Sequence, residues 1–328
     1  MATINTALVV RVADGQSPKL SKENIDIPRP AENQVLVKVS HAAQNPTDIQ
    51  SFDGNAFGDG AVLGCDFVGE IVEVGSGVTH LARGDIVAAL VWGGEVKYVG
   101  AYSQYCLADE CISFKLPAGI SPEQTSTVPL TAVTAWLALF SKDFSYSTWT
   151  TTNDGRIFGL IHKTSVGLYA IQLASLLGFE VVTTCSLKHE DQVRSSGGPD
   201  LAYAFDTIGN STSSSAASQA LRDGTGTLCT VRPGKAHTES VASGTAVTDV
   251  LVWTAFLKDH SYGEFKWPAS PNDHELASEL FEQLPARLAN GTIKPNNPRV
   301  LRGLDAVPDA FQEYRDGKIS AYKIVYKL

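Results

Sequence analysis

The chain has 328 residues, which favours two domains, because a single hydrophobic core usually stops growing at about 250–300 residues. Its 26 Lys and Arg residues against 35 Asp and Glu residues give a net charge of −9, which argues against a nucleic-acid or anionic-membrane partner and favours a small molecule. No secretory pattern opens the chain and no apolar run reaches the roughly 20 residues that span a bilayer, so we expect a soluble, cytoplasmic protein.

The first part of the chain, from Thr6 to about Gly119, has the pattern of β structure. Short alternating or apolar runs are separated by turn residues at the spacing of an all-β domain. The clearest runs are ALVVRV, QVLVKVSHAA, FVGEIVEVG and DIVAALV. We expect a barrel-like domain here.

From residue 121 to residue 267 the pattern changes to alternating helices and strands. The predicted order is a helix at 122–140, a strand at 156–161, a helix at 164–178, a strand at 180–185, then LAYAFDTI, a small-residue helix and GTLCTVRP. The serine-rich patch at 210–218 is expected to be the capping turn of that small-residue helix. This alternation predicts a parallel sheet built from βαβ units.

The last part of the chain contains one amphipathic helix, at 273–290, and a closing strand, AYKIVYKL. A strand after the alternating region indicates that the chain returns to the first domain. We therefore predict a β-barrel domain formed by residues 1–120 and 290–328, and a domain with a parallel α/β sheet formed by residues 121–289.

Several segments carry a family resemblance. GCDFVGEIVEVGSGVTHLARGDIV (Gly64 to Val87) and NPTDIQ (Asn45 to Gln50) resemble the medium-chain dehydrogenase/reductases. PLTAVTAW, TSVGLYAIQLASLLGFEVVTTCS, YAFDTI and GKISAYKIVYKL resemble, in the same order, the fungal enoyl reductases that act in trans with polyketide synthases. The resemblance implies an α/β fold with a GroES-like domain, a Rossmann insertion and a cleft between them. It also implies NADPH-dependent reduction of an enoyl thioester or a related enone.

The same resemblance implies the residues of the site. Asn45, Thr47, Cys65 and Thr131 match the substrate cleft, and Thr164, Ser165 and Val166 match the loop that binds the cofactor phosphates. Ser186 and Lys188 match the positions that hold the 2′-phosphate of NADP in relatives. The implied partners are a small polyketide-like substrate and a polyketide synthase, and the implied assembly is a monomer or a homodimer.

The sequence argues against a zinc ion. Relatives that bind zinc have a cysteine and a His-Glu pair where this chain has Asn45 to Asp48 and Cys65-Asp66. A catalytic zinc ion needs three protein ligands, and Cys65 has no evident partners. The five cysteines are scattered and form no C-x-x-C pair. We expect no metal.

The nucleotide loop departs from the family pattern. A Rossmann first turn needs small residues, because backbone amides approach the pyrophosphate at a helix N-terminus. Here Ile161, His162 and Lys163 occupy the positions that are glycine-rich in relatives. Either His162 and Lys163 bind phosphate through their charge, or their side chains fill the pocket and close it.

A second departure lies between the predicted strand ending at Ser186 and the strand beginning at Leu201. The 14 residues between them are too few for the helix, strand and helix that relatives have here, since one βαβ unit takes roughly 30 residues. We therefore predict that the Rossmann half is shortened by one βα unit. Both departures predict that NADPH binds weakly or not at all.

Three functions remain open from the sequence. The leading hypothesis is a non-redox enzyme, an isomerase or cyclase that acts on a polyketide-derived intermediate. Its acid/base candidates are His162, Lys163, Asp48 and Asp66, although the two aspartates also suit turn capping and His162 and Lys163 also suit a surface loop. The alternatives are an NADPH-dependent trans-acting enoyl reductase and a non-catalytic paralogue that serves as a scaffold.

Overall fold

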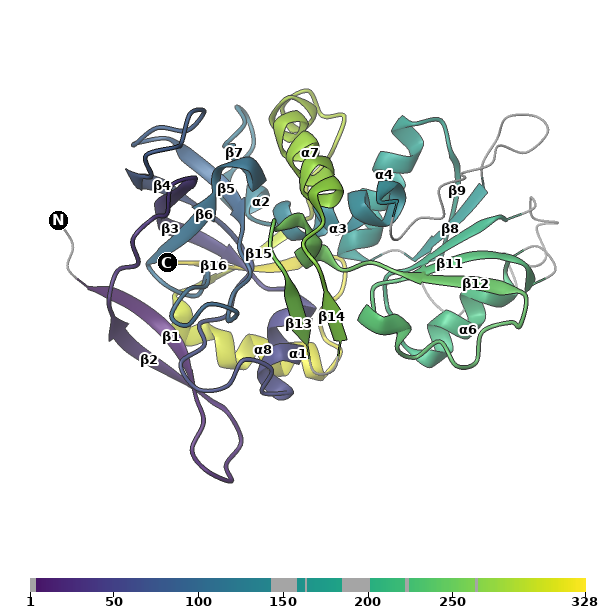
Figure 1. Ribbon diagram of the computed structural model, residues 1–328, viewed down its shortest axis with the longest axis horizontal. Helices are drawn as coiled ribbons and strands as arrows, with labels where there is room; N and C mark the ends of the chain where they lie inside the picture. The colour runs from purple at the N-terminus through teal and green to yellow at the C-terminus, as the bar shows by residue number, and fades with distance from the viewer. Residues whose placement is uncertain (1–3, 143–157, 163, 185–200, 222–223, 263–264) are drawn as a thin grey trace. The chain divides into compact units, whose positions relative to one another are not determined.

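The computed structural model describes residues 4–142, 158–162, 164–184, 201–221, 224–262 and 265–328 (Figure 1). The chain divides into two compact units: unit 1 contains residues 1–130 and 281–328, and unit 2 contains residues 131–280. The unit boundaries fall inside helices α3 (Pro129–Phe140) and α7 (Pro271–Ala289). The sequence placed them just before the first helix and just after the last.

Unit 1 is built on a seven-stranded sheet in the order β15-β16-β3-β4-β5-β7, with β6 paired to β3. Its strands are β3 (Gln34–Ala43), β4 (Asp66–Val74), β5 (Ile86–Leu90), β6 (Tyr105–Asp109), β7 (Ser113–Lys115), β15 (Pro298–Arg302) and β16 (Lys323–Lys327). A separate hairpin joins β1 (Asn5–Arg11) to β2 (Lys19–Ile25). The closing strand β16 pairs antiparallel with β3, so the end of the chain does return to the first domain.

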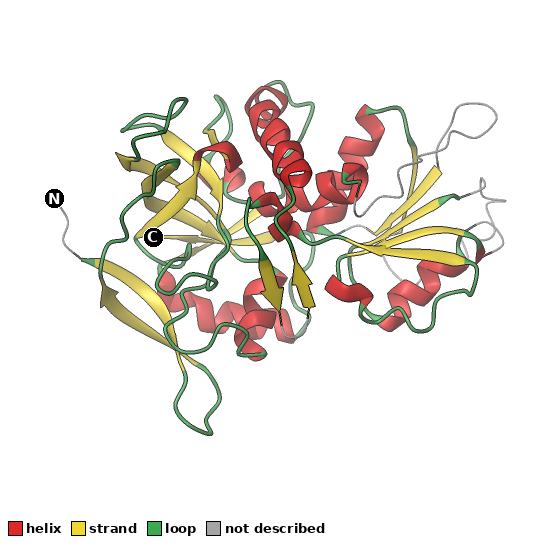
Figure 2. Ribbon diagram, in the orientation of Figure 1, coloured by secondary structure: helices red, strands yellow, loops and turns green. Residues whose placement is uncertain are grey.

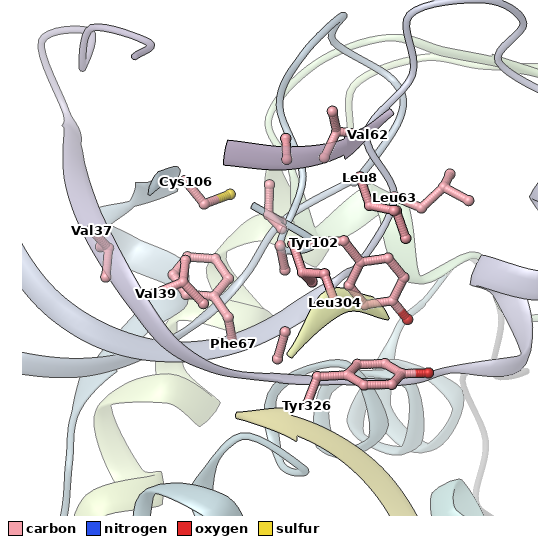
Figure 3. Close-up of a cluster of buried hydrophobic side chains, with 14 of the residues drawn as sticks. Leu8, Val37, Val39, Val62, Leu63, Phe67, Tyr102, Cys106, Leu304 and Tyr326 are labelled. Atoms are coloured by element: carbon pink, nitrogen blue, oxygen red, sulfur yellow. The ribbon is translucent and has the colours of Figure 1, made fainter. Parts of the chain in front are cut away.

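The core of unit 1 lies against these strands (Figure 3). Val37 and Val39 on β3, Phe67 on β4 and Leu8 on β1 belong to one buried cluster, in which Tyr102 packs edge-on against Tyr326 with ring centroids 5.4 Å apart. The two tyrosine hydroxyl groups lie at the same margin of the cluster (Figure 3). That margin is where the apolar core gives way to buried polar groups.

The helices of unit 1 are short. They are α1 (Pro46–Asp53), α2 (Pro122–Thr125), α8 (Val307–Arg315) and the 3₁₀ turns η1 (Glu110–Ile112) and η6 (Leu304–Ala306). The single helix predicted at 122–140 is wrong, because the structure has α2, a turn at 126–128 and then α3. Pro129 at the start of α3 has no backbone N–H to donate to the preceding turn, so a continuous helix is disfavoured there.

Unit 2 contains a five-stranded parallel sheet in the order β12-β11-β10-β8-β9 (Figure 2). The strands are β8 (Phe158–His162), β9 (Glu180–Thr184), β10 (Tyr203–Asp206), β11 (Gly226–Thr230) and β12 (Thr245–Asp249). Helix α4 (Ser165–Leu176) contacts β8 and β9, and α6 (Ser211–Gln219) contacts β10 and β11. Because β8 has β9 on one side and β10 on the other, the strand order reverses at β8, which is the position where doubly wound sheets bind ligands.

The remaining elements of unit 2 are short, and most follow β11. They are η4 (Pro233–Lys235), η5 (Val252–Ala255), β13 (His260–Tyr262) and β14 (Phe265–Trp267). Within the described residues, no strand pairs with the outer edge of β9. The predicted loss of a βα unit concerns residues 187–200, which lie outside the described part of the chain.

The serine-rich patch was placed wrongly by the sequence. Residues 211–219 are helix α6 itself, and only Asn210 serves as its cap, with its side chain accepting a hydrogen bond from the Ser213 amide at 2.8 Å. The hydroxyl groups of Ser213 and Ser214 point into the protein toward Asp206. Buried acceptors of this kind offset the weak helix propensity of serine.

Candidate functional site

Asp48, in the first turn of α1, is buried in unit 1 and accepts four hydrogen bonds. The Asn45 amide and the Tyr102 hydroxyl donate to Oδ2 at 2.7 and 3.0 Å, and the Gly64 amide and the Cys65 thiol donate to Oδ1 at 3.2 and 3.4 Å. Burial raises the pKa of Asp48 to about 6, although these donors act in the opposite direction. The carboxyl group therefore joins α1 to the turn before β4.

Asp66, the first residue of β4, is the centre of a second buried cluster. The Leu130 amide donates to Oδ1 at 2.6 Å, whereas Lys323 Nζ and Asn45 Nδ2 donate to Oδ2 at 2.6 and 3.0 Å. Lys323 also donates to the Thr127 carbonyl at 3.2 Å. A buried carboxylate needs a paired cation of this kind, because an isolated charge is costly to bury.

The side chain of Asn45 has its orientation set by this ion pair. Asp66, paired with a cation, offers only acceptor oxygens, so the Asn45 amide turns its NH₂ group toward Asp66. Its Oδ1 atom is buried and has no hydrogen-bond partner among the described residues. The hydrogen bond to Asp66 thus fixes the orientation of the Asn45 amide, and its Oδ1 atom accepts no hydrogen bond from the described residues.

Sequence reasoning placed Asn45, Thr47 and Cys65 in a substrate cleft. In the structure Asn45 and Cys65 both donate to Asp48, and Asn45 also donates to Asp66. Thr47, the second residue of α1, is half-buried. Thr131 is buried but belongs to unit 2. Their role in substrate binding stays a prediction.

Cys65 offers no thiolate to a metal. Burial and the neighbouring Asp48 raise the pKa of its thiol, so it stays protonated, whereas zinc binds the thiolate. Within the described residues, no group of three His, Cys, Asp or Glu side chains could hold a metal ion. The donor set at this position therefore does not fit a zinc ion.

Helix α4 in unit 2 begins at the carboxyl end of β8, beside the reversal of strand order. Thr164 caps the helix, and its hydroxyl oxygen accepts a hydrogen bond from the Gly167 amide at 3.1 Å. The amides of Ser165 and Val166 have no acceptor among the described residues. Backbone amides at the positive end of a helix dipole that have no acceptor in the described part of the chain fit a phosphate group. This turn therefore fits the pyrophosphate of a dinucleotide.

The other predicted cofactor contacts fall largely outside the described residues. The structure does not describe Lys163, Ser186 or Lys188. It describes the backbone of His162, in β8, but not its side chain. Their proposed roles stay predictions.

Sequence reasoning missed four residues that organise these sites. They are Tyr102 and Lys323 in unit 1 and Asp206 and Arg232 in unit 2. Lys323 had a visible signal, since a lysine between apolar residues in AYKIVYKL lies on the alternation expected for a core position. Asp206, at the end of an apolar strand, had a similar signal.

Comparison with known proteins agrees with this architecture. Residues 31–118 match the family model of the alcohol dehydrogenase GroES-like domain. Dehydrogenase orf1 of Aspergillus niger is 30% identical over 97% of this chain and 98% of its own length. Trans-enoyl reductase grgB of a Penicillium species is 28% identical over 93% of this chain and 94% of its own length. An alcohol dehydrogenase superfamily protein from Novosphingobium aromaticivorans has the same fold, with a TM-score of 0.75, 22% identity and 99% coverage of both chains.

The chain therefore belongs to the medium-chain dehydrogenase/reductase superfamily, with a GroES-like domain and a Rossmann-type parallel sheet. Within that superfamily it resembles the fungal trans-enoyl reductases. Among the described residues, no helix is long and apolar enough to cross a membrane.

Proposed function

We propose that this protein is an NADPH-dependent enoyl reductase that reduces the double bond of an enoyl thioester during polyketide biosynthesis. The observation that carries the proposal is the match of nearly the whole chain to proteins named trans-enoyl reductases. The first turn of α4 supports it from the structure, because this turn lies at the reversal of strand order and the amides of Ser165 and Val166 have no acceptor among the described residues.

The relatives favour this function over the non-redox hypothesis. That hypothesis rested on Ile161, His162 and Lys163 and on the short interval 187–200, and no positive motif supported it. The scaffold alternative is less favoured, because relatives that match over nearly their whole length carry enzyme names.

The protein's own residues would bind and orient the reactants, while NADPH would supply the hydride. Ser165 and Val166 would donate their backbone amides to the pyrophosphate, and the Thr164 cap would hold the helix start in place. In unit 1, Asn45 would belong to the substrate cleft, as its match to the cleft segment of relatives implies. The partner proposed from the relatives' names is a polyketide synthase that holds the growing thioester.

A proline substitution tests the phosphate turn directly. Ser165→Pro removes one amide donor but keeps the helix, since proline suits the first helical position. Thr164 already has the extended backbone that a residue before proline requires, with φ −113° and ψ −175°. Ser211→Pro is the matched control, because Ser211 is the first residue of α6 and its cap Asn210 is also extended, with φ −120° and ψ 166°.

We expect wild type and Ser211→Pro to bind NADPH in a calorimetric titration and to consume it when an enoyl thioester is added. Ser165→Pro should bind NADPH about tenfold more weakly, which corresponds to one lost charge-assisted hydrogen bond. Absence of NADPH binding by the wild type would refute the proposal. Equal NADPH affinity of the two proline variants would show that the pyrophosphate does not bind at this turn.

A further inference from the structure

A buried carboxylate anchors the loop that follows β10. Asp206 ends that strand and is fully buried. Its Oδ1 atom accepts hydrogen bonds from the amides of Ile208 and Gly209, both at 3.0 Å. Its Oδ2 atom accepts hydrogen bonds from the hydroxyl groups of Ser213 and Ser214, both at 2.7 Å. One side chain thus fixes residues 207–209 to the first turn of α6.

A second anchor comes from Arg232, two residues after the end of the neighbouring strand β11. Arg232 Nε donates to the Gly209 carbonyl at 2.8 Å, and Arg232 Nη2 donates to the Ile208 carbonyl at 3.4 Å. Gly209 has a φ of +71°, and a Cβ atom there would lie 2.6 Å from Arg232 Cγ. The loop is therefore held through both its amides and its carbonyls, and a side chain at 209 would break the second contact.

The residue that this arrangement positions is Thr207. Its hydroxyl oxygen accepts a hydrogen bond from the Thr164 hydroxyl at 2.7 Å, across the gap between β10 and β8. A threonine hydroxyl has one proton and two lone pairs. With its proton directed to Thr207, Thr164 keeps a lone pair for the Gly167 amide, so the two hydrogen bonds support each other.

We propose that Thr207 is a positioning residue for cofactor binding, because it orients the Thr164 hydroxyl and so fixes the first turn of α4. The cofactor part of this inference rests on the proposed function, in which that turn receives the pyrophosphate. Thr207 itself needs no contact with NADPH. Asp206 and Arg232 act indirectly, because they fix the loop that contains Thr207.

An isosteric pair of variants tests this role. Thr207→Val removes the acceptor without changing the volume of the side chain. Thr245→Val is the matched control, because Thr245 is at the amino end of β12, where its hydroxyl donates to the Gly224 carbonyl at 3.0 Å. Thr207→Ser keeps a hydroxyl group and should restore the wild-type properties. For all three variants we would measure NADPH affinity, the urea midpoint and hydrogen exchange of the peptide that contains residues 164–172.

We expect Thr207→Val to bind NADPH about 2- to 10-fold more weakly, the effect of one neutral hydrogen bond. Amide exchange in residues 164–172 should be faster than in Thr245→Val, while the urea midpoints of the two variants stay alike. Unchanged affinity together with unchanged exchange in Thr207→Val would overturn the inference. If the wild type bound no NADPH, the proposed function would fail by itself, and the exchange result alone would decide whether Thr207 positions α4.

Discussion

Lys323 Nζ lies 2.6 Å from Asp66 Oδ2, although the two residues are 257 positions apart in the chain. Lys323 is 4% exposed and Asp66 is fully buried. Strand β16 thus places the ammonium group of Lys323 against Asp66, the first residue of β4, which also accepts a hydrogen bond from the Asn45 side chain. This ion pair links the closing strand to the segment that carries the family resemblance.

Replacing Lys323 by an uncharged residue should lower the free energy of unfolding. In Lys323→Met, Asp66 would remain as a buried, unpaired carboxylate, and we expect the free energy of unfolding to fall by about 3–5 kcal/mol. Lys327→Met is the control, because Lys327 is exposed on the same strand and surface substitutions change stability by about 0.5 kcal/mol or less. Urea denaturation measures both.

A double variant separates charge from packing in the same experiment. Lys323→Met combined with Asp66→Asn removes both charges, so it should be more stable than Lys323→Met alone. If Lys323→Met were no less stable than Lys327→Met, the ion pair would make no contribution to folding.

Asp48 predicts a pH dependence of stability. Burial raises its pKa from 3.8 to about 6 in the folded protein, so between these values the folded state binds more protons than the unfolded state. Its contribution to stability is therefore complete below about pH 4 and is lost as the pH rises through about 6. A shift of two pKa units corresponds to about 3 kcal/mol.

The measurement is the free energy of unfolding of wild type and Asp48→Asn between pH 4 and pH 8. The difference between the two proteins isolates the ionisation of this one carboxyl group from all other titrating groups. We expect the wild type to lose stability relative to Asp48→Asn as the pH rises. A difference that stays constant with pH would show that Asp48 keeps its ordinary pKa.

Much of this architecture could be predicted from local patterns. The parallel strands of unit 2 are short apolar runs followed by helices, and the return of AYKIVYKL to the first domain follows from its position after the last helix. The pairing of Lys323 with Asp66 could not be predicted, because it depends on which residues two distant strands place opposite each other. The break before Pro129 was visible as a proline inside a helical pattern, but the apolar residues around it favoured one helix.

The same limit applies to the candidate site. Thr164, Ser165 and Val166 were predicted as cofactor contacts because the resemblance aligns them with the phosphate loop of relatives, which is continuous in sequence. Asp206, Thr207 and Arg232 come from the ends of two other strands, and only the strand order brings them to the same edge. Neither the spacing nor the composition of the sequence contains that order.

The enoyl reduction that we propose should not depend on a metal ion. The described residues provide no group of three metal-binding side chains, and the thiol of Cys65 is held protonated. We expect prolonged dialysis against a chelator to leave the rate of NADPH oxidation with an enoyl thioester unchanged. A loss of activity that added Zn²⁺ restores would contradict this prediction.

The residues before α4 provide the sharpest test of how the cofactor is bound. Replacing Ile161, His162 and Lys163 together by Gly-Gly-Ser would restore the small residues that a phosphate turn prefers. If these side chains obstruct the turn, NADPH affinity should rise by about tenfold, which corresponds to 1.4 kcal/mol. Calorimetric titration of both proteins measures the change, and His162→Ala shows how much of it comes from the imidazole alone.

A lower affinity in the Gly-Gly-Ser variant would mean instead that His162 or Lys163 binds phosphate through its charge. An unchanged affinity would point instead to the short interval 187–200, where the predicted loss of a βα unit would weaken binding of the adenosine end of the cofactor.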